Sequence, residues 1–253
     1  FSVVPWKGLP EKVRERILRR SETDISQILP AVSKIIEGVK KDGDRALIDY
    51  TLKFDKTDIA SLGLRVREEE FEEAERTLSG EVKDAISFGI KNTRLFHEGQ
   101  LPKGLELTEI IPGLLSGERA TPIDSAGLYV PRGRGSFPSM LYMLALPAKV
   151  AGVSRIPVIT PPGPCGKIDP GCLFAARLCG ITEIYRVGGA HGIAALAYGP
   201  ESIPRVYKIL GPVSIYVPAA KRPLSRVVDI GLPAGHSESL ILADSHADPW
   251  KVA

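Results

Sequence analysis

The residues of this sequence that could bind a ligand lie where short apolar runs end in segments rich in Gly, Pro and Ser. Glycine lets a ligand approach the backbone, and a helix that begins there presents free N–H groups to an anion. None of the segments has the G-x-G-x-x-G spacing of a dinucleotide fingerprint or the spacing of a Walker loop. The spacing alone therefore predicts a site for an anionic or phosphorylated small molecule. The segments are residues 131–139, 160–164, 188–192, 211–214 and 235–237.

The apolar runs before these segments predict the strands of a parallel sheet. Each of the first four runs is followed by a helix-like stretch, and strand–helix units in series imply parallel pairing with right-handed crossovers. In an open parallel sheet, ligands bind beyond the carboxyl ends of the strands. The predicted strands are residues 126–130, 155–160, 183–187, 206–210 and 239–244.

The first 125 residues are predicted to be mainly helical. A short helix within residues 8–20 precedes a long amphipathic helix, which reaches the turn signal KKDGD, and a further helix follows that turn. A short strand at Leu64–Val66, two helices with a solvated charged face, and a hairpin with Pro-Gly at its turn complete this part.

Composition excludes several classes of partner. The 253 residues carry a net charge of only +3, with 43% hydrophobic and 25% charged residues. No Lys/Arg stripe indicates a nucleic acid, and no apolar run has the ~20 residues that a membrane span needs. The first residues lack the charged start and apolar core of a signal peptide, so a cytoplasmic location is expected.

The cysteines and histidines do not form a metal-binding pattern. Cys165, Cys172 and Cys179 recur every seven positions, which fits neither a disulfide scaffold nor a zinc site. We expect Cys172 and Cys179 to be small packing groups on one helix, in a reducing compartment. The four histidines, His97, His191, His236 and His246, show no ligand spacing either.

The longer motifs resemble those of the histidinol dehydrogenase family, and they occur in the family's order over essentially the whole chain. The upstream motifs are GDRALIDYTLKFD and LFHEGQ. The later ones are GLYVPRG, PSMLYMLALPAKVAGV, EIYRVGGAHGIAALAYGPESIPRVYKILGP, AAKR and AGHSES-LILAD. The resemblance implies an α/β fold of incomplete Rossmann-like parallel-sheet domains with an N-terminal helical extension.

The resemblance also implies a domain division. Residues 1–27 would form the N-terminal helical extension, and residues 28–125 plus 239–253 a first, incomplete α/β domain. Residues 126–238 would form the Rossmann-like NAD-binding domain.

The activity implied by the resemblance is oxidation of L-histidinol through the aldehyde to L-histidine, in histidine biosynthesis. Such an oxidoreductase uses NAD and zinc, acts on a small-molecule amino alcohol, and assembles as a homodimer. Nucleic acid and membrane partners are not expected.

Four residues are matched to the family's ligand contacts. Tyr129, His191 and Ser214 stand at positions that contact NAD, and Ser237 at a position that contacts the substrate. The family has Gln in place of His191, Gly-Asn in place of Val213-Ser214, and Pro in place of His236. These departures lie in the ligand-facing segments, so a reshaped cofactor pocket is expected.

The family's zinc ligands and its catalytic Glu-His pair correspond to positions beyond Ala253. We therefore expect no catalytic residue and no metal ligand in this chain, and no activity of the chain by itself. Three hypotheses follow: part of a histidinol dehydrogenase, part of a relative that oxidises another polar alcohol with NAD, or a non-catalytic binding module. Arg132 and Arg134 either bind a phosphate or an acidic substrate group, or are solvated loop residues.

Overall fold

The computed structural model describes residues 5–18, 26–102, 104–132, 135–212, 216–231 and 241–252. Contacts divide the chain into two units. One unit is formed by the chain ends, Phe1–Asp24 and Pro233–Ala253, and its described elements bury no residue. These elements are η1 (Trp6–Gly8), α1 (Glu11–Leu18) and α9 (Pro249–Val252).

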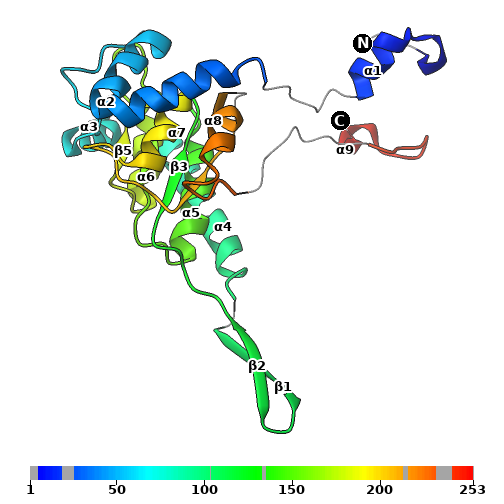
Figure 1. The fold of residues 1–253 in the computed structure, drawn as a ribbon. Helices are drawn as coiled ribbons and strands as arrows, with labels where there is room; N and C mark the ends of the chain where they lie inside the picture. The colour runs from blue at the N-terminus through cyan, green and yellow to red at the C-terminus, as the bar shows by residue number, and fades with distance from the viewer. Residues whose placement is uncertain are drawn as a thin grey trace. The chain divides into compact units, whose positions relative to one another are not determined.

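The larger unit, Ile25–Leu232, is built around a four-stranded parallel sheet (Figure 1). Its strand order is β5-β4-β3-β6, so the chain moves outward from β3 on one side and then crosses back to add β6 on the other. The strands are β3 (Ala126–Tyr129), β4 (Val158–Ile159), β5 (Ile184–Tyr185) and β6 (Lys208–Leu210). Each strand is followed by a helix, and these are α5 (Pro138–Val150), α6 (Pro170–Leu178), α7 (Gly189–Tyr198) and α8 (Tyr216–Leu224). The predicted α/β fold is confirmed.

Helices cover both faces of the sheet because its strands are apolar on both faces, as parallel strands between two layers must be. Tyr129, Ile159 and Tyr185 point into a core shared with α2 (Leu29–Asp55), α7 and α8. The residue before each of them, Leu128, Val158 and Ile184, points into the opposite core. That core is shared with α3 (Glu68–Thr77), α4 (Gly80–Glu98), α5 and α6.

Helix α2 carries the predicted apolar stripe and the predicted turn. Val32, Ile36 and Val39 are buried on that stripe. Gly43 has φ 53° and ψ −132°, so two helical segments meet at a bend there. Only glycine adopts this backbone conformation readily. The second segment then runs to Asp55 and carries its end toward the sheet.

Both outer strands of the sheet have further backbone neighbours. Beside β5, the Val66 N–H donates to the Ile184 carbonyl and the Arg186 N–H donates to the Leu64 carbonyl. Beside β6, Asp229 exchanges backbone hydrogen bonds with Tyr207 and Ile209.

The strand predicted over residues 239–244 is wrong in its described part, because Ile241–Asp244 has no regular secondary structure. Residues 239 and 240 lie outside the described residues. An apolar run becomes a strand only where a neighbouring strand pairs with it, and Asp229 takes the place beside β6.

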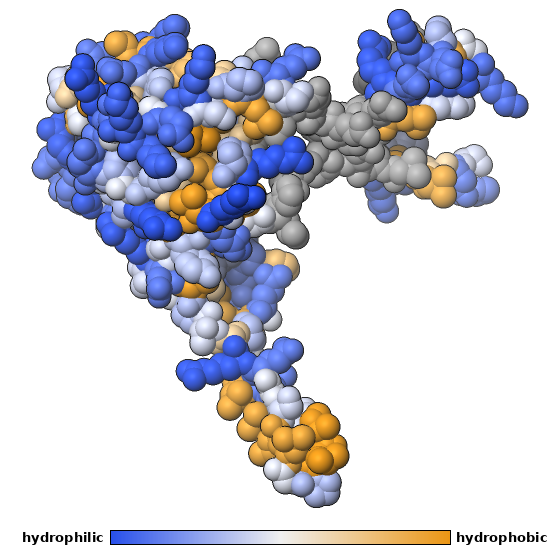
Figure 2. Space-filling view, viewed as in Figure 1, coloured by the Kyte–Doolittle hydropathy of each residue, from blue (hydrophilic) through white to orange (hydrophobic). Residues whose placement is uncertain are grey.

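The predicted hairpin is confirmed as β1 (Leu105–Ile111) and β2 (Leu114–Arg119), an antiparallel pair. Every residue of both strands is exposed. The hairpin therefore has an apolar surface, visible in orange in Figure 2. Its large exposed side chains are Leu105, Leu107, Ile110, Ile111, Leu114 and Leu115. Within the described part of the chain, no helix is long and apolar enough to cross a membrane.

The division into three parts at residues 27, 125 and 238 stays a prediction. In the larger unit, helices from before residue 125 cover both faces of the sheet, α2 on one face and α3 and α4 on the other.

Candidate ligand-binding site

The candidate site is the region at the carboxyl ends of β3 and β6. Neighbouring strands whose connections leave in opposite directions open a crevice, and ligands of doubly wound folds bind there. Gly211, directly after β6, has φ +135°, and a Cβ added to it would lie 2.2 Å from the Tyr129 carbonyl oxygen. Glycine therefore lets the end of β6 pass against the end of β3.

Tyr129 is the last residue of β3, and only 4% of its surface is exposed. Burial raises the pKa of its hydroxyl, and the nearby Asp55 charge raises it further. The backbone N–H of Gly189, in the first turn of α7, hydrogen-bonds to this hydroxyl and acts in the opposite direction. The predicted NAD-contacting tyrosine thus holds its hydroxyl at the start of a helix, next to a carboxylate.

Asp55 is the last residue of α2 and was not among the predicted site residues. Its Oδ2 is buried and has no hydrogen-bond partner. Burial raises the pKa of this carboxyl to about 6, although the nearby Arg132 charge lowers it. The sequence offered one signal, an acidic residue at the end of an amphipathic helix, and that pattern is common on protein surfaces.

Arg132, in the loop after β3, is exposed and donates from Nη1 to the Pro162 carbonyl at 3.3 Å. It thereby connects the loop after β3 to the loop after β4. Its charge lies close enough to act on the Asp55 carboxyl. Arg134 lies outside the described residues.

His191, in the first turn of α7, is only 2% exposed. Its Nε2 lies 3.3 Å from the Thr51 hydroxyl, and the rings of Tyr50 and Phe54 are each 6.0 Å from its own. Burial lowers the pKa of His191 to about 3, so the imidazole is neutral. Its side chain packs against the end of α2, near Asp55, and its contact with NAD stays a prediction.

The remaining predicted contacts cannot be placed in this geometry. Ser214 and Ser237, together with the altered Val213 and His236, lie outside the described residues.

No group of three or more His, Cys, Asp or Glu side chains that could hold a metal ion is found among the described residues. His97 is hydrogen-bonded to Gln100 at 2.7 Å, and His246 is exposed beside Asp244. Cys172 and Cys179 are buried, and burial raises the pKa of each thiol to about 11. They are packing groups, as predicted.

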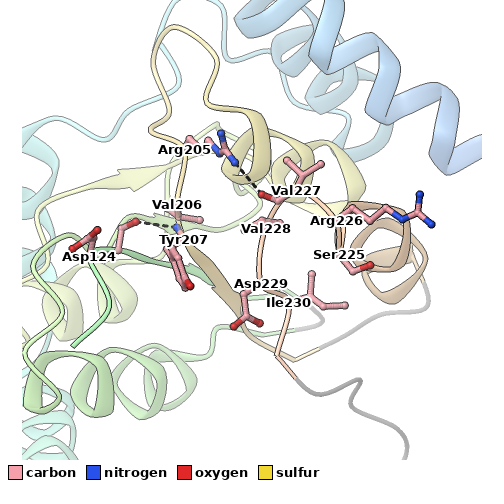
Figure 3. Close-up of a pocket in the computed structure, with 11 residues that line it drawn as sticks. Asp124, Arg205, Val206, Tyr207, Ser225, Arg226, Val227, Val228, Asp229 and Ile230 are labelled. Carbon is pink, nitrogen blue, oxygen red and sulfur yellow. Dashed lines mark hydrogen bonds between the residues drawn. The ribbon is translucent and has the colours of Figure 1, made fainter. Parts of the chain in front are cut away.

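A hollow of about 640 Å³ lies at the opposite end of the sheet (Figure 3). Asp124 and Ser125 precede β3 there, and Tyr207 precedes β6. Arg205 donates a hydrogen bond to the Val227 carbonyl at 3.0 Å, and the Tyr207 N–H donates one to the Ser125 hydroxyl at 3.0 Å. Because ligands of parallel sheets bind beyond the carboxyl ends, this hollow at the amino ends is not the candidate site.

The strand order and the helices on both faces define a doubly wound α/β protein of the Rossmann-like class. Residues 18–253 match the family model described as histidinol dehydrogenase. The chain belongs to the histidinol dehydrogenase family.

The relatives agree with this assignment. The chain is 47% identical over 240 residues to a histidinol dehydrogenase of Synechocystis sp., covering 95% of this chain and 55% of that protein. It is 50% identical over 232 residues to a histidinol dehydrogenase homolog of Cereibacter sphaeroides, covering 91% of this chain and 53% of that protein. A crystal structure of histidinol dehydrogenase from Elizabethkingia anophelis superimposes with a TM-score of 0.83 at 37% identity, covering 90% of this chain and 51% of that one. The chain therefore spans about half the length of the relatives it matches.

Proposed function

We propose that this chain is the cofactor-binding part of an NAD-dependent histidinol dehydrogenase, which oxidises L-histidinol through the aldehyde to L-histidine. The observation that supports this most directly is the reversal of strand order between β3 and β6, which in doubly wound folds marks the ligand site at the carboxyl ends of the strands. Close to Tyr129 at the end of β3, Asp55 has a carboxylate oxygen without a hydrogen-bond partner. Family membership supplies the class of reaction.

The described residues fit a dinucleotide. The start of α7 lies beside Tyr129, and the N-terminus of a helix suits a phosphate. NAD would supply the hydride acceptor for both oxidation steps. The chain's own residues would orient the cofactor and exclude water from its reactive face.

Zinc fits this chain poorly, because the described residues offer no group of metal-binding side chains. In our proposal the zinc ligands and the proton-accepting residues come from the part of the longer protein that this chain does not include. We also propose that the longer protein assembles as a homodimer.

The proposed activity can be tested on the full-length protein by following the reduction of NAD with L-histidinol as substrate. We expect two NADH formed for each histidinol consumed, with L-histidine as the product. NADH formation without histidine, or no reduction at saturating NAD, would contradict the proposal.

Oxidation of another polar alcohol is the second candidate function. Several relatives of comparable identity carry the name histidinol dehydrogenase homolog, among them one of Rhizobium meliloti at 47% identity. The residues that depart from the family pattern, such as His191 and Ser214, lie in segments that the sequence predicts to face the ligand. The same assay with a panel of polar amino alcohols separates the two candidates, since only the second predicts a higher kcat/KM for an alcohol other than histidinol.

Ser237 is proposed to contact the substrate. Replacing it with Ala should raise the KM for histidinol about tenfold, which corresponds to the loss of one hydrogen bond, and should leave the Kd for NAD unchanged. Steady-state kinetics and NAD titration measure the two effects separately. A weakened NAD affinity with an unchanged KM would show that this segment belongs to the cofactor site.

A further inference from the structure

The residues directly after α2 are hydrogen-bonded to the loop at the carboxyl end of β4. The buried Thr57 hydroxyl lies 3.2 Å from the Gly163 carbonyl and 3.1 Å from the Asp55 carbonyl. Arg132 is bonded to the Pro162 carbonyl in the same loop. The Thr57 hydroxyl therefore places Asp55 beside the position where the chain leaves β4, although Asp55 lies about a hundred residues earlier in the sequence.

The Asp55 carboxylate has a free acceptor at this position. Within the described residues, its Oδ2 and the Nε of Arg14 are the buried side-chain polar atoms without a hydrogen-bond partner. Arg14 belongs to the unit formed by the chain ends, so Asp55 holds the one such atom among the described residues of the unit that contains the sheet. A buried carboxylate without a donor destabilises the folded state, and a ligand hydroxyl that reaches the carboxylate would supply one.

The place of this carboxylate within the fold identifies the donor. In dinucleotide-binding folds an acidic residue after the second strand of the first βαβ unit hydrogen-bonds to the adenosine ribose. Here that second strand is β4, and the residues after it are Thr160, Pro161, Pro162 and Gly163, which include no carboxylate. Asp55 brings an acid to this place from a different part of the chain.

We propose that Asp55 accepts hydrogen bonds from the adenosine ribose hydroxyls of NAD and that its charge discriminates against NADP. This inference rests on the proposed NAD site and assigns a residue to its cofactor specificity. The 2′-phosphate of NADP would bring a second negative charge against the carboxylate. Arg132, which lies beside Asp55, would be available to that phosphate once the carboxylate charge is removed.

The test is a titration of the full-length protein with NAD, NADP and the 2′-deoxyadenosine analogue of NAD. Binding is measured at pH 8, where a carboxyl with a pKa of about 6 is ionised. We expect Asp55→Asn to weaken NAD binding by about tenfold to a hundredfold, the range for a hydrogen bond to a charged group. NADP binding should tighten in the same variant, so that the preference for NAD falls by more than tenfold.

The deoxy analogue tests the atom that is contacted. It should bind the wild type more weakly than NAD does, and it should bind the Asp55→Asn variant as well as NAD does, because the hydroxyl and the carboxylate form one interaction. Asp58→Asn is the matched control, since Asp58 is exposed and accepts from the Ala60 N–H on the far side of the same turn. The control should retain wild-type affinities for all three nucleotides.

The stability of the unliganded protein separates ligand binding from folding. Asp55→Asn removes a buried charge without changing the side-chain volume, so its unfolding temperature should equal or exceed that of the wild type. If the wild type binds NAD and Asp55→Asn binds it equally well, the ribose contact is wrong and the proposed function remains. If the wild type binds none of the nucleotides, the proposed function and this inference are both wrong.

Discussion

Replacing Arg186 with Met is expected to destabilise the protein by about 3–5 kcal/mol, the largest effect of any single substitution considered in the described residues. Arg186 follows β5 and is completely buried. Its Nη2 is paired with Glu70 of α3, its Nε donates to the Gly166 carbonyl at 2.9 Å, and its Nη1 donates to the Arg65 carbonyl at 2.6 Å. One side chain therefore connects β5, α3 and the segment beside β5.

The large effect arises because the substitution leaves the buried partners of Arg186 without its guanidinium group. Burial would raise the pKa of Glu70, but hydrogen bonds from the Arg186 side chain and the Arg67 N–H hold it below its usual value. Without Arg186, the Gly166 carbonyl loses the Arg186 donor, and the Glu70 carboxylate keeps the Arg67 N–H but loses its buried cation. The free-energy penalty of a buried charge without its partner exceeds the free energy gained from the apolar contacts of Met.

Equilibrium unfolding in urea at neutral pH measures this loss. Arg155→Met is the matched control, because Arg155 forms an exposed ion pair with Glu183 at 3.0 Å and should lose less than about 1 kcal/mol. The double variant Arg186→Met with Glu70→Gln should regain part of the loss, since it removes the unpaired charge. Equal losses for Arg186→Met and Arg155→Met would contradict the assignment of Arg186 as the buried connection.

The second large effect is expected in acid, where the buried His191 should lower the stability of the folded protein. Its pKa is about 3 in the folded protein and about 6.5 in the unfolded chain, because burial disfavours the imidazolium. The unfolded state therefore binds the proton first, and stability is lost as the pH falls from about 6.5 toward 3. By pH 5 the loss is about 2 kcal/mol, since each pH unit in this window contributes about 1.4 kcal/mol.

Asp55 changes the stability of the protein in the opposite direction as the pH falls. Its folded pKa of about 6 lies above the ordinary value of 3.8, so the folded state binds its proton first and the protein gains stability as the pH falls through that range. The His191 contribution must therefore be isolated by difference.

Unfolding free energies of the wild type and of His191→Gln, measured from pH 7.5 to pH 4.5, provide that difference. Gln keeps a polar group for the Thr51 hydroxyl and does not titrate, so its stability advantage should grow as the pH falls. His97→Gln is the control, because His97 lies on α4 beside Gln100 and not in the core. Parallel pH profiles for the wild type and His191→Gln would show that His191 is solvated in the protein.

Local patterns in the sequence predicted most of the fold. Period-3.6 apolar stripes marked α2 and the helices after it, and the glycine at each strand end marked where the sheet would present ligands. The strands were predicted too long, since each of the four parallel strands has only two to four paired residues. The run Ser239–Asp244 resembled a strand because of its apolar composition. Whether such a run forms a strand depends on a pairing partner, which the sequence does not show.

The candidate site was only partly predictable, for a physical reason. Tyr129 was assigned by its match to a motif of the histidinol dehydrogenase family, and its contact with NAD stays a prediction. Asp55 owes its proposed role to the contact of the neighbouring Thr57 with a loop more than a hundred residues away, and nothing local distinguishes Asp55 from a solvated acid at a helix end. Likewise, the sequence contains no sign that His191 is enclosed by Thr51 and the rings of α2.

The backbone neighbours on the two outer strands limit how this protein can associate. β5 is only two residues long and β6 three, so the bonds to Leu64–Val66 and to Asp229 take up most of the donors and acceptors on their outer sides. A strand from another molecule would find few free groups there, which blocks aggregation by β-strand addition at this sheet. A partner can instead bind this unit through side chains, and the exposed apolar residues of the β1–β2 hairpin form one surface among the described residues that offers them.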